Sequence, residues 1–226
     1  MDLARVIDHT LLKSTATPAD IDRLCDEARQ YSFWSVCVNP CYVARAAGRL
    51  KDTGIKVCSV VAFPLGCGTT PMKVMEGVEA VRNGAAELDV VMNVGLFKAG
   101  EYEAVARDIK DFIVLTPGVV HKVIIETCYL TDAEKAGAAR LAAEVGAEFV
   151  KTSTGFGPGG AKSGDVALMK EAAIGKSRVK AAGGIKDLDT LVHMVQAGAE
   201  RIGTSSGVAI VEEFMARHRA KQGPPE

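Results

Sequence analysis

The chain has 226 residues, of which 48% are hydrophobic and 24% are charged, and its formal net charge is -1. This length and apolar content suit one domain with a sizeable buried core and argue against a disordered chain. The balanced charge and scattered basic residues exclude an electrostatic surface for nucleic acid or for an anionic membrane.

Short apolar runs alternate with amphipathic segments along the whole chain, which is typical of βα units and a parallel sheet. A brief run at residues 6–9 can form a first strand, and seven further strands are predicted at 33–38, 56–62, 87–93, 122–126, 148–153, 178–182 and 200–203. These runs are rich in valine and isoleucine without strict alternation, so we expect both faces of the sheet to be covered.

Two helices between these strands begin with capping signals. Thr17 followed by Pro18 and Asp20 predicts one helix start, and Thr131 with Glu134 predicts another. Apolar residues then recur at helical spacing in both segments, and Gly146 ends the second.

Eight strands that alternate with helices predict an α/β fold, namely a single-domain TIM (β/α)8 barrel with a short N-terminal helical extension, over residues 1–216. The alternative is an open doubly wound sheet, but the Gly-x-Gly-x-x-Gly turn typical of that fold is absent after the first strand. The basic, proline-terminated segment 217–226 is predicted to be a disordered tail.

The cysteines and histidines predict neither disulfides nor a metal site. The six cysteines form no Cys-x-x-Cys pair, and the four histidines have no metal-ligand spacing. No apolar run reaches the roughly 20 residues that a membrane span needs, and the N-terminus lacks signal-peptide features. We therefore expect a cytoplasmic protein whose thiols pack as small hydrophobic groups, with no metal, no cofactor and no membrane or nucleic-acid partner.

Two lysines in apolar strands indicate amine chemistry. Lys151 and Lys180 lie near the ends of consecutive predicted strands, and Asp89 lies near the end of an earlier one. A lysine is a nucleophile only when it is neutral, and burial beside a second ammonium lowers its pKa. Alternatively, each lysine reaches the rim and pairs with an acid, while Asp89 and Asp8 serve as structural counter-ions.

Glycine-rich segments at 155–160, 183–186 and 203–207 each follow a strand and precede a helix. Exposed backbone N–H groups at such turns bind anions, and in barrels a phosphate often sits after the last two strands. Tight turns also require glycine, so each segment alone is weak evidence of a phosphate site.

Several motifs together resemble the deoxyribose-phosphate aldolase family. They occur in order over nearly the whole chain, at residues 7–13, 36–40, 63–66, 87–91, 122–127, 150–157, 179–185 and 203–207. No single motif is specific, but their combination is.

The resemblance implies a class I aldolase, a lyase that reversibly cleaves 2-deoxy-D-ribose 5-phosphate to acetaldehyde and D-glyceraldehyde 3-phosphate without a metal, in deoxyribonucleotide catabolism. It implies that Lys151 forms the Schiff base, Lys180 lowers the pKa of the nucleophile, Asp89 shuttles protons and Asp8 pairs with Lys180. The implied phosphate-binding residues are Gly155, Gly183, Gly184, Lys186, Gly203, Ser205 and Ser206. We also expect a homo-oligomer, a dimer or a tetramer.

The chain departs from the family pattern in three places. Lys162 replaces a frequent threonine cap, so Ser163 is predicted to cap that helix instead. Lys186 replaces a common arginine, and the chain lacks the C-terminal tyrosine that some members bring to the active site. Two other functions stay open: a transaldolase-like Schiff-base enzyme and a non-catalytic sugar-phosphate binding protein.

Overall fold

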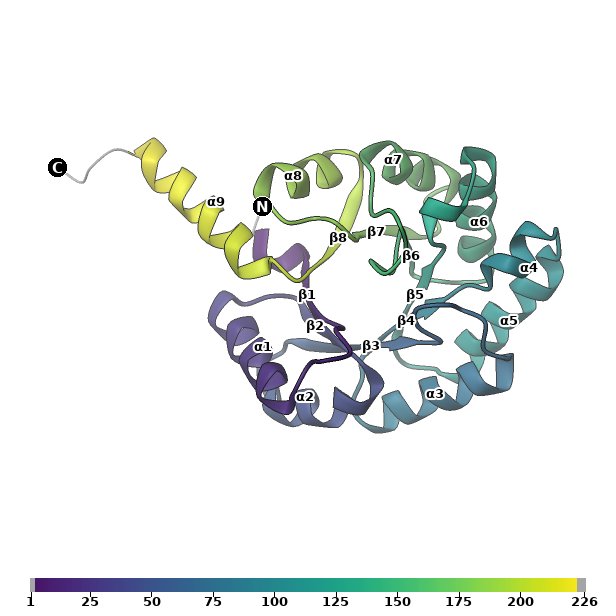
Figure 1. Ribbon diagram of the computed structural model, residues 1–226, viewed down its shortest axis with the longest axis horizontal. Coiled ribbons are helices and arrows are strands. Elements are labelled where there is room, and N and C mark those ends of the chain that lie inside the picture. Colours follow the sequence, from purple (N-terminus) through teal and green to yellow (C-terminus); the bar gives the residue numbers. More distant parts are fainter. Residues whose placement is uncertain (1–2, 223–226) are drawn as a thin grey trace.

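The structure is a computed structural model that describes residues 3–222, with side chains as far as Arg219. Eight parallel strands pair in chain order, and β8 pairs with β1, so that the sheet is a closed barrel (Figure 1). The strands are β1 (Ile7–Leu11), β2 (Ser35–Val38), β3 (Lys56–Val61), β4 (Glu87–Val91), β5 (Val120–Ile124), β6 (Phe149–Lys151), β7 (Arg178–Ala182) and β8 (Ala199–Thr204). The predicted barrel is thus confirmed, including the brief first strand.

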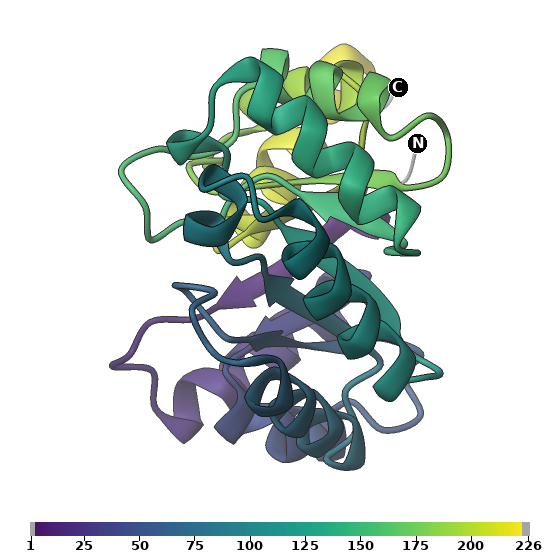
Figure 2. The same ribbon diagram turned by 90° about the vertical axis from the view of Figure 1, so that its right-hand side faces the viewer.

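The helices form a layer outside the strands (Figures 1 and 2). They are α1 (Pro18–Tyr31), α2 (Val43–Arg49), α3 (Thr70–Arg82), α4 (Val94–Lys98), α5 (Tyr102–Leu115), α6 (Asp132–Glu144), α7 (Ser163–Ala172), α8 (Leu188–Gln196) and α9 (Gly207–Gln222), with 3-10 turns at Leu3–Val6, Pro40–Tyr42 and Thr127–Tyr129. The Leu3–Val6 turn is the N-terminal helical extension. Between residues 3 and 222, none of these helices combines the length and the apolar composition needed to cross a membrane.

The main hydrophobic core lies between the strands and this helical layer. Close helix packing contributes to it: a Cβ atom at Gly77 on α3 would lie 2.7 Å from the ring of Phe112 on α5. A second, small apolar cluster contains Leu12, Cys37, Cys58 and Val60. The centre of the barrel is otherwise largely polar.

Both predicted capping boxes are present. The Thr17 hydroxyl accepts from Asp20 N–H while the Asp20 carboxylate accepts from Thr17 N–H, and Thr131 and Glu134 do the same at α6. The predicted cap at Ser163 is wrong. Lys162 occupies the cap position without a side-chain hydrogen bond, and Ser163 is the first residue of α7.

Several strands end earlier than predicted. The strand predicted at 87–93 stops at Val91, because the Asn93 side chain accepts the Leu96 N–H and caps α4. The strand predicted at 122–126 is shifted to Val120–Ile124, and Glu126 takes a left-handed backbone conformation beyond its end. The apolar runs continue past both strands into the loops.

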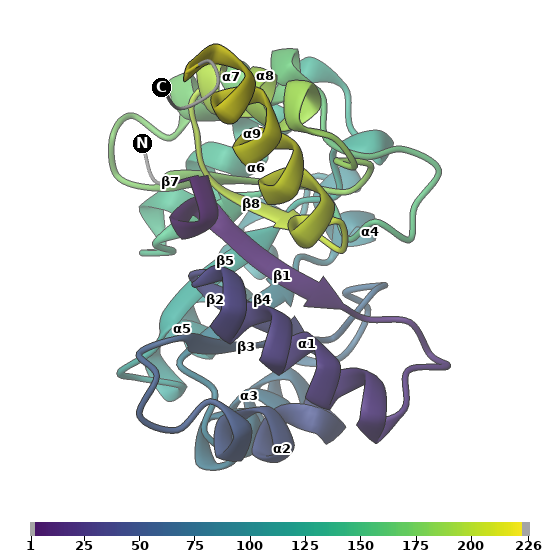
Figure 3. The same ribbon diagram turned by 90° about the vertical axis from the view of Figure 1, so that its left-hand side faces the viewer.

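Helix α9 crosses the predicted domain boundary at residue 216 and continues to Gln222 (Figure 3). Arg217 stabilises this part through contacts of 2.5 Å with Asp189 on α8 and with Glu213 one turn earlier. The remaining residues of the predicted tail, 223–226, lie outside the described part of the chain.

Candidate active site

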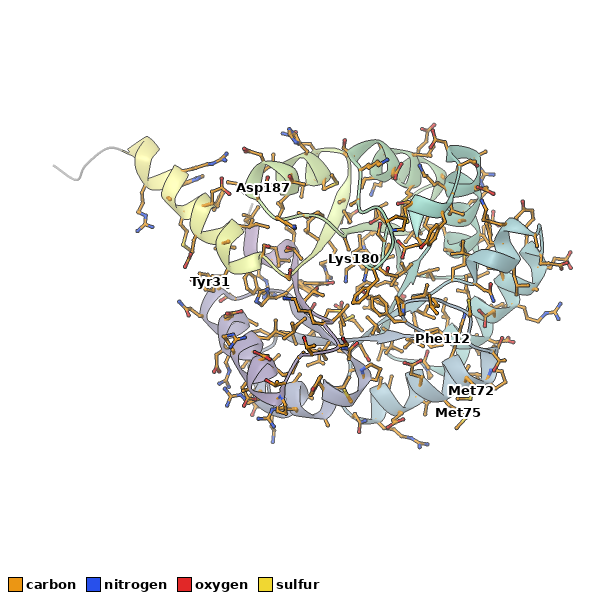
Figure 4. The ribbon with its side chains drawn as sticks, viewed as in Figure 1. Tyr31, Met72, Met75, Phe112, Lys180 and Asp187 are labelled. Carbon is orange, nitrogen blue, oxygen red and sulfur yellow. The ribbon has the colours of Figure 1, made fainter. Side chains whose placement is uncertain are left out.

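Seven charged side chains from six strands fill the centre of the barrel. Side chains alternate between the two faces of a strand, so residues two apart share the inner face. The inner-facing charged residues are Asp8 on β1, Glu87 and Asp89 on β4, Lys122 on β5, Lys151 on β6, Lys180 on β7 and Arg201 on β8. Figure 4 shows Lys180 near the middle of the ring of strands.

Asp89 joins the lysines. Its Oδ2 lies 2.8 Å from Lys151 Nζ and 2.7 Å from Lys180 Nζ, and its Oδ1 lies 2.7 Å from Lys122 Nζ. The Cys58 thiol also donates to Oδ1, with the sulfur 3.1 Å away. Both carboxylate oxygens of Asp89 are therefore fully engaged.

Asp8 forms the next part of the network. Its Oδ2 lies 2.5 Å from Lys180 Nζ, and its Oδ1 accepts from Arg201 at 2.7 Å and from the Ser35 hydroxyl at 2.6 Å. The structure thus brings Lys151, Lys180, Asp89 and Asp8 into one continuous set of contacts.

Glu87 and Arg201 close the network on the side away from Lys151. Glu87 lies 2.6 Å from Lys122 Nζ and 3.1 Å from Arg201, and it accepts from Trp34 Nε1 at 2.8 Å. The Arg201 guanidinium stacks 4.6 Å from the centre of the Trp34 ring. This stacking shields the buried guanidinium with an aromatic face.

The network favours the charged forms of Asp89 and Lys180. Burial alone would raise the pKa of Asp89, but Lys122, Lys151 and Lys180 outweigh burial and hold it well below the usual value. Burial would likewise lower the pKa of Lys180, but Asp8 and Asp89 together raise it above its ordinary value. Lys180 therefore places a positive charge beside Lys151 in the resting site.

The charges of the network do not balance when every member is ionised. Four basic side chains (Lys122, Lys151, Lys180 and Arg201) face three carboxylates (Asp8, Glu87 and Asp89). A buried net charge is costly, so loss of one proton is favoured. Among the residues that the structure describes, Lys151 contacts one carboxylate, whereas each of the other three bases contacts at least two, so Lys151 is the least tightly held base of the network.

Four residues of the site are not among those predicted above: Lys122, Glu87, Arg201 and Cys58. The first three carry a usable signal, because each is a charged residue inside an otherwise apolar strand. Lys122 is the first residue of the strand predicted at 122–126, a position from which a lysine can reach solvent. The shift of β5 toward the N-terminus moves Lys122 to the strand centre, where it is fully buried.

A cavity of about 310 Å³ opens above Lys151. Six of the predicted phosphate-binding residues line it: Gly155, Gly183, Gly184, Lys186, Gly203 and Ser205. Ser206 is not part of the lining, and its N–H donates to Thr204 Oγ1 at 2.9 Å.

Two glycines of this lining have backbone N–H groups that are available to a ligand. Gly155 and Gly184 have positive φ angles of 85° and 79°, and their N–H groups donate to no acceptor within residues 3–222. These N–H groups and the Lys186 ammonium suit an anion.

A second donor set lies beside the lysines. The sulfur atoms of Cys37 and Cys58 and an oxygen of Asp89 lie within 4.8 Å of one another, a spacing that three metal ligands can share. Three lysine amines already contact Asp89, however, and they would repel a bound cation. This set therefore suits hydrogen bonding within the site better than metal coordination.

Comparison with known proteins identifies close relatives. The family model described as "DeoC/LacD family aldolase" matches residues 3–213. The chain is 56% identical to the deoxyribose-phosphate aldolase of Carboxydothermus hydrogenoformans, over 95% of this chain and 96% of the relative. It is 54% identical to that of Aciduliprofundum boonei, over 93% and 96% of the two chains.

Solved structures share the fold as well. The structure described as "QR15, an Aldolase" has 45% sequence identity and a TM-score of 0.93, and the match covers 96% of this chain and 98% of that one. The tetrameric deoxyribose phosphate aldolase from Aeropyrum pernix has 36% identity and a TM-score of 0.89, with 95% and 92% covered.

Proposed function

The chain belongs to the DeoC/LacD family of aldolases, and on this premise we propose that it reversibly cleaves 2-deoxy-D-ribose 5-phosphate into acetaldehyde and D-glyceraldehyde 3-phosphate. The observation that carries the proposal is the unbalanced network, in which Lys151 contacts one carboxylate and faces the cavity. A neutral amine in that position can attack an aldehyde.

In the proposed mechanism, Lys151 Nζ adds to C1 of the open-chain sugar, and water leaves to form an iminium. The C3 hydroxyl then loses its proton, and the C2–C3 electron pair moves toward the iminium nitrogen. Glyceraldehyde 3-phosphate departs and an enamine remains on Lys151. Protonation at C2 and hydrolysis release acetaldehyde and restore the amine.

Proton transfer in this mechanism uses the contacts that join Lys151, Asp89 and Lys180. Asp89 Oδ2 bridges the amines of Lys151 and Lys180, and Lys180 contacts Asp8. Protons can move between the reacting atoms and Lys180 along this set, directly or through water. Asp8 acts by holding Lys180 in place, and Ser35 and Arg201 hold Asp8.

The test is product analysis with purified protein. With deoxyribose 5-phosphate we expect equimolar acetaldehyde and glyceraldehyde 3-phosphate. A transaldolase-like enzyme would instead need a ketose donor and transfer a three-carbon unit, and a binding protein would form neither product. Either of those results would overturn the proposal.

The phosphate of the substrate is proposed to bind among the glycine turns and Lys186. Lys186→Glu should raise KM for deoxyribose 5-phosphate by roughly tenfold, because one charge-assisted hydrogen bond is lost and a repulsion is added. Steady-state kinetics with unphosphorylated deoxyribose supplies the control, and its kcat/KM should change little. Equal losses for both sugars would show that Lys186 does not serve the phosphate.

We also propose that the chain assembles as a dimer or tetramer in the cytoplasm. Met72 and Met75 are 60% and 66% exposed on the outer face of α3 (Figure 4). Adjacent exposed apolar side chains favour a protein interface. Light scattering should report a mass at least twice that of the 23.8 kDa chain, and a monomer at micromolar concentration would contradict the assembly.

A further inference from the structure

Glu126 combines a strained backbone with a buried carboxylate that the proposed mechanism does not use. It lies just after β5 with φ 54° and ψ 69°, a left-handed conformation that residues other than glycine rarely adopt. Its side chain is only 3% exposed. Strain of this kind persists where the surrounding structure enforces it, often beside functional sites.

The Glu126 carboxylate meets no basic side chain within residues 3–219, unlike Asp8, Glu87 and Asp89. An unpaired buried carboxylate is costly unless other donors satisfy it. Here the donors come from Thr154, whose N–H lies 3.3 Å and 3.2 Å from the two oxygens and whose hydroxyl donates to Oε2. One residue of the β6–α7 loop therefore supplies its main partners.

Thr154 also holds the next part of the loop. Its Oγ1 accepts the N–H of Phe156 at 3.0 Å. The backbone of Gly157 packs closely on Cys128 and Glu126. A Cβ atom at this position would lie 2.9 Å from Cys128 Sγ and 3.5 Å from Glu126 Cδ. The loop can close over the carboxylate because residue 157 has no side chain.

The turn built on Glu126 presents two groups at the cavity mouth. Gly155, between Thr154 and Phe156, lines the cavity and has the free N–H described above. Phe156 is 56% exposed and meets Phe63 edge to face, with ring centres 5.2 Å apart. Glu126 itself lines a smaller pocket on the other side of Thr154 and is not part of the Lys151 cavity.

We propose that Glu126 is a positioning residue that fixes the Gly155 N–H and the Phe156 ring around the phosphate end of the substrate, and so sets the preference for phosphorylated over unphosphorylated aldoses. This inference rests on the proposed function. It assigns no chemical step to Glu126, because the carboxylate reaches the substrate only through Thr154 and Gly155.

The test compares four variants: two that disrupt the contact, one matched control, and Thr154→Ser as the conservative replacement. Glu126→Gln keeps the side-chain shape but replaces one acceptor oxygen with an amide donor, and Thr154→Val replaces the hydroxyl with a methyl group. Glu148→Gln is the matched control, because Glu148 also accepts a backbone N–H, from His121 at 2.8 Å, but at the start of β6, far from the cavity mouth.

For Glu126→Gln and Thr154→Val, the KM for deoxyribose 5-phosphate and the inhibition constant of inorganic phosphate should rise by about tenfold, the value of one charge-assisted hydrogen bond. Turnover of unphosphorylated deoxyribose and borohydride trapping of acetaldehyde should change by no more than about twofold, because neither uses the phosphate loop. Thr154→Ser should restore most of the phosphate affinity. Glu148→Gln should match the parent in every assay.

Three results would overturn the proposal: an unchanged phosphate inhibition constant, equal losses for both sugars, or an equal effect of Glu148→Gln. If Glu126→Gln does not fold, Thr154→Val decides alone. A parent protein that traps no acetaldehyde and cleaves no sugar would refute the proposed function instead, so the two failures are distinguishable.

Discussion

Lys151→Ala should abolish aldol cleavage, lowering kcat by on the order of 10⁴-fold or more, as expected when the nucleophile of a covalent mechanism is removed. Borohydride reduction of the parent protein with acetaldehyde should add one two-carbon unit, and peptide mass analysis should locate it on Lys151. The variant should take up no label. The variant should still fold, because Lys151 contacts Asp89 alone among the described carboxylates, and Asp89 keeps Lys122 and Lys180 as partners when Lys151 is removed.

Lys135→Met is the matched control for labelling. Lys135 is also a largely buried lysine in contact with carboxylates, at 2.8 Å from Asp165, but it lies on α6 outside the barrel. The Lys135→Met variant should take up the two-carbon label and cleave the sugar as the parent does. A two-carbon adduct that maps to another lysine, or normal turnover in Lys151→Ala, would refute the Schiff-base assignment.

Asp89→Asn should cause the largest loss of stability. The substitution leaves the amines of Lys122, Lys151 and Lys180 facing a neutral amide, and an uncompensated buried charge of this kind costs about 3–5 kcal/mol. Urea unfolding at neutral pH should show this loss as a lower midpoint with an unchanged slope. Activity should fall as well, because the bridge between Lys151 and Lys180 is broken.

A second substitution separates charge from packing. Asp89→Asn combined with Lys122→Met removes one negative and one positive charge, so the double variant should recover part of the lost stability. Lys122→Met alone should itself be destabilising, because among residues 3–219 Glu87 then keeps Arg201 as its single basic partner. If the two single losses simply add, Asp89 does not act through the charge balance of the network.

The sequence predicts the barrel well because local signals agree with the overall fold. The capping boxes at Thr17 and Thr131 place two helix starts correctly, and the apolar strands recur at the spacing of βα units. The placement of Lys151, Lys180 and Asp89 in one cluster also follows from strand position, since parallel strands bring matching positions together at one end of a barrel.

Other features depend on tertiary contacts that no local pattern contains. Apolar residues continue past Val91, so the end of β4 is set by the Asn93 cap rather than by hydrophobicity. Residues 217–222 are mostly polar, yet they continue α9, and Arg217 at the start of this segment pairs with Asp189 and Glu213. In the sequence, Lys122 stands where a strand-end lysine would be exposed. Only the register of β5, in which Lys122 pairs with Asp89 on β4, shows that it is an inner residue.

The ionic interior of the barrel also limits how the protein can change over evolution or in the laboratory. Apolar residues between strands and helices can be exchanged one at a time at modest cost, because neighbouring side chains repack. The inner charged residues share partners, so a neutral replacement at Glu87 or Arg201 takes away one ion-pair partner from each residue that it contacts. Those residues are then buried charges with fewer opposite charges beside them. Substitutions at these positions should therefore be tolerated in compensating pairs, and transfer of this chemistry to another barrel requires moving the group as a unit.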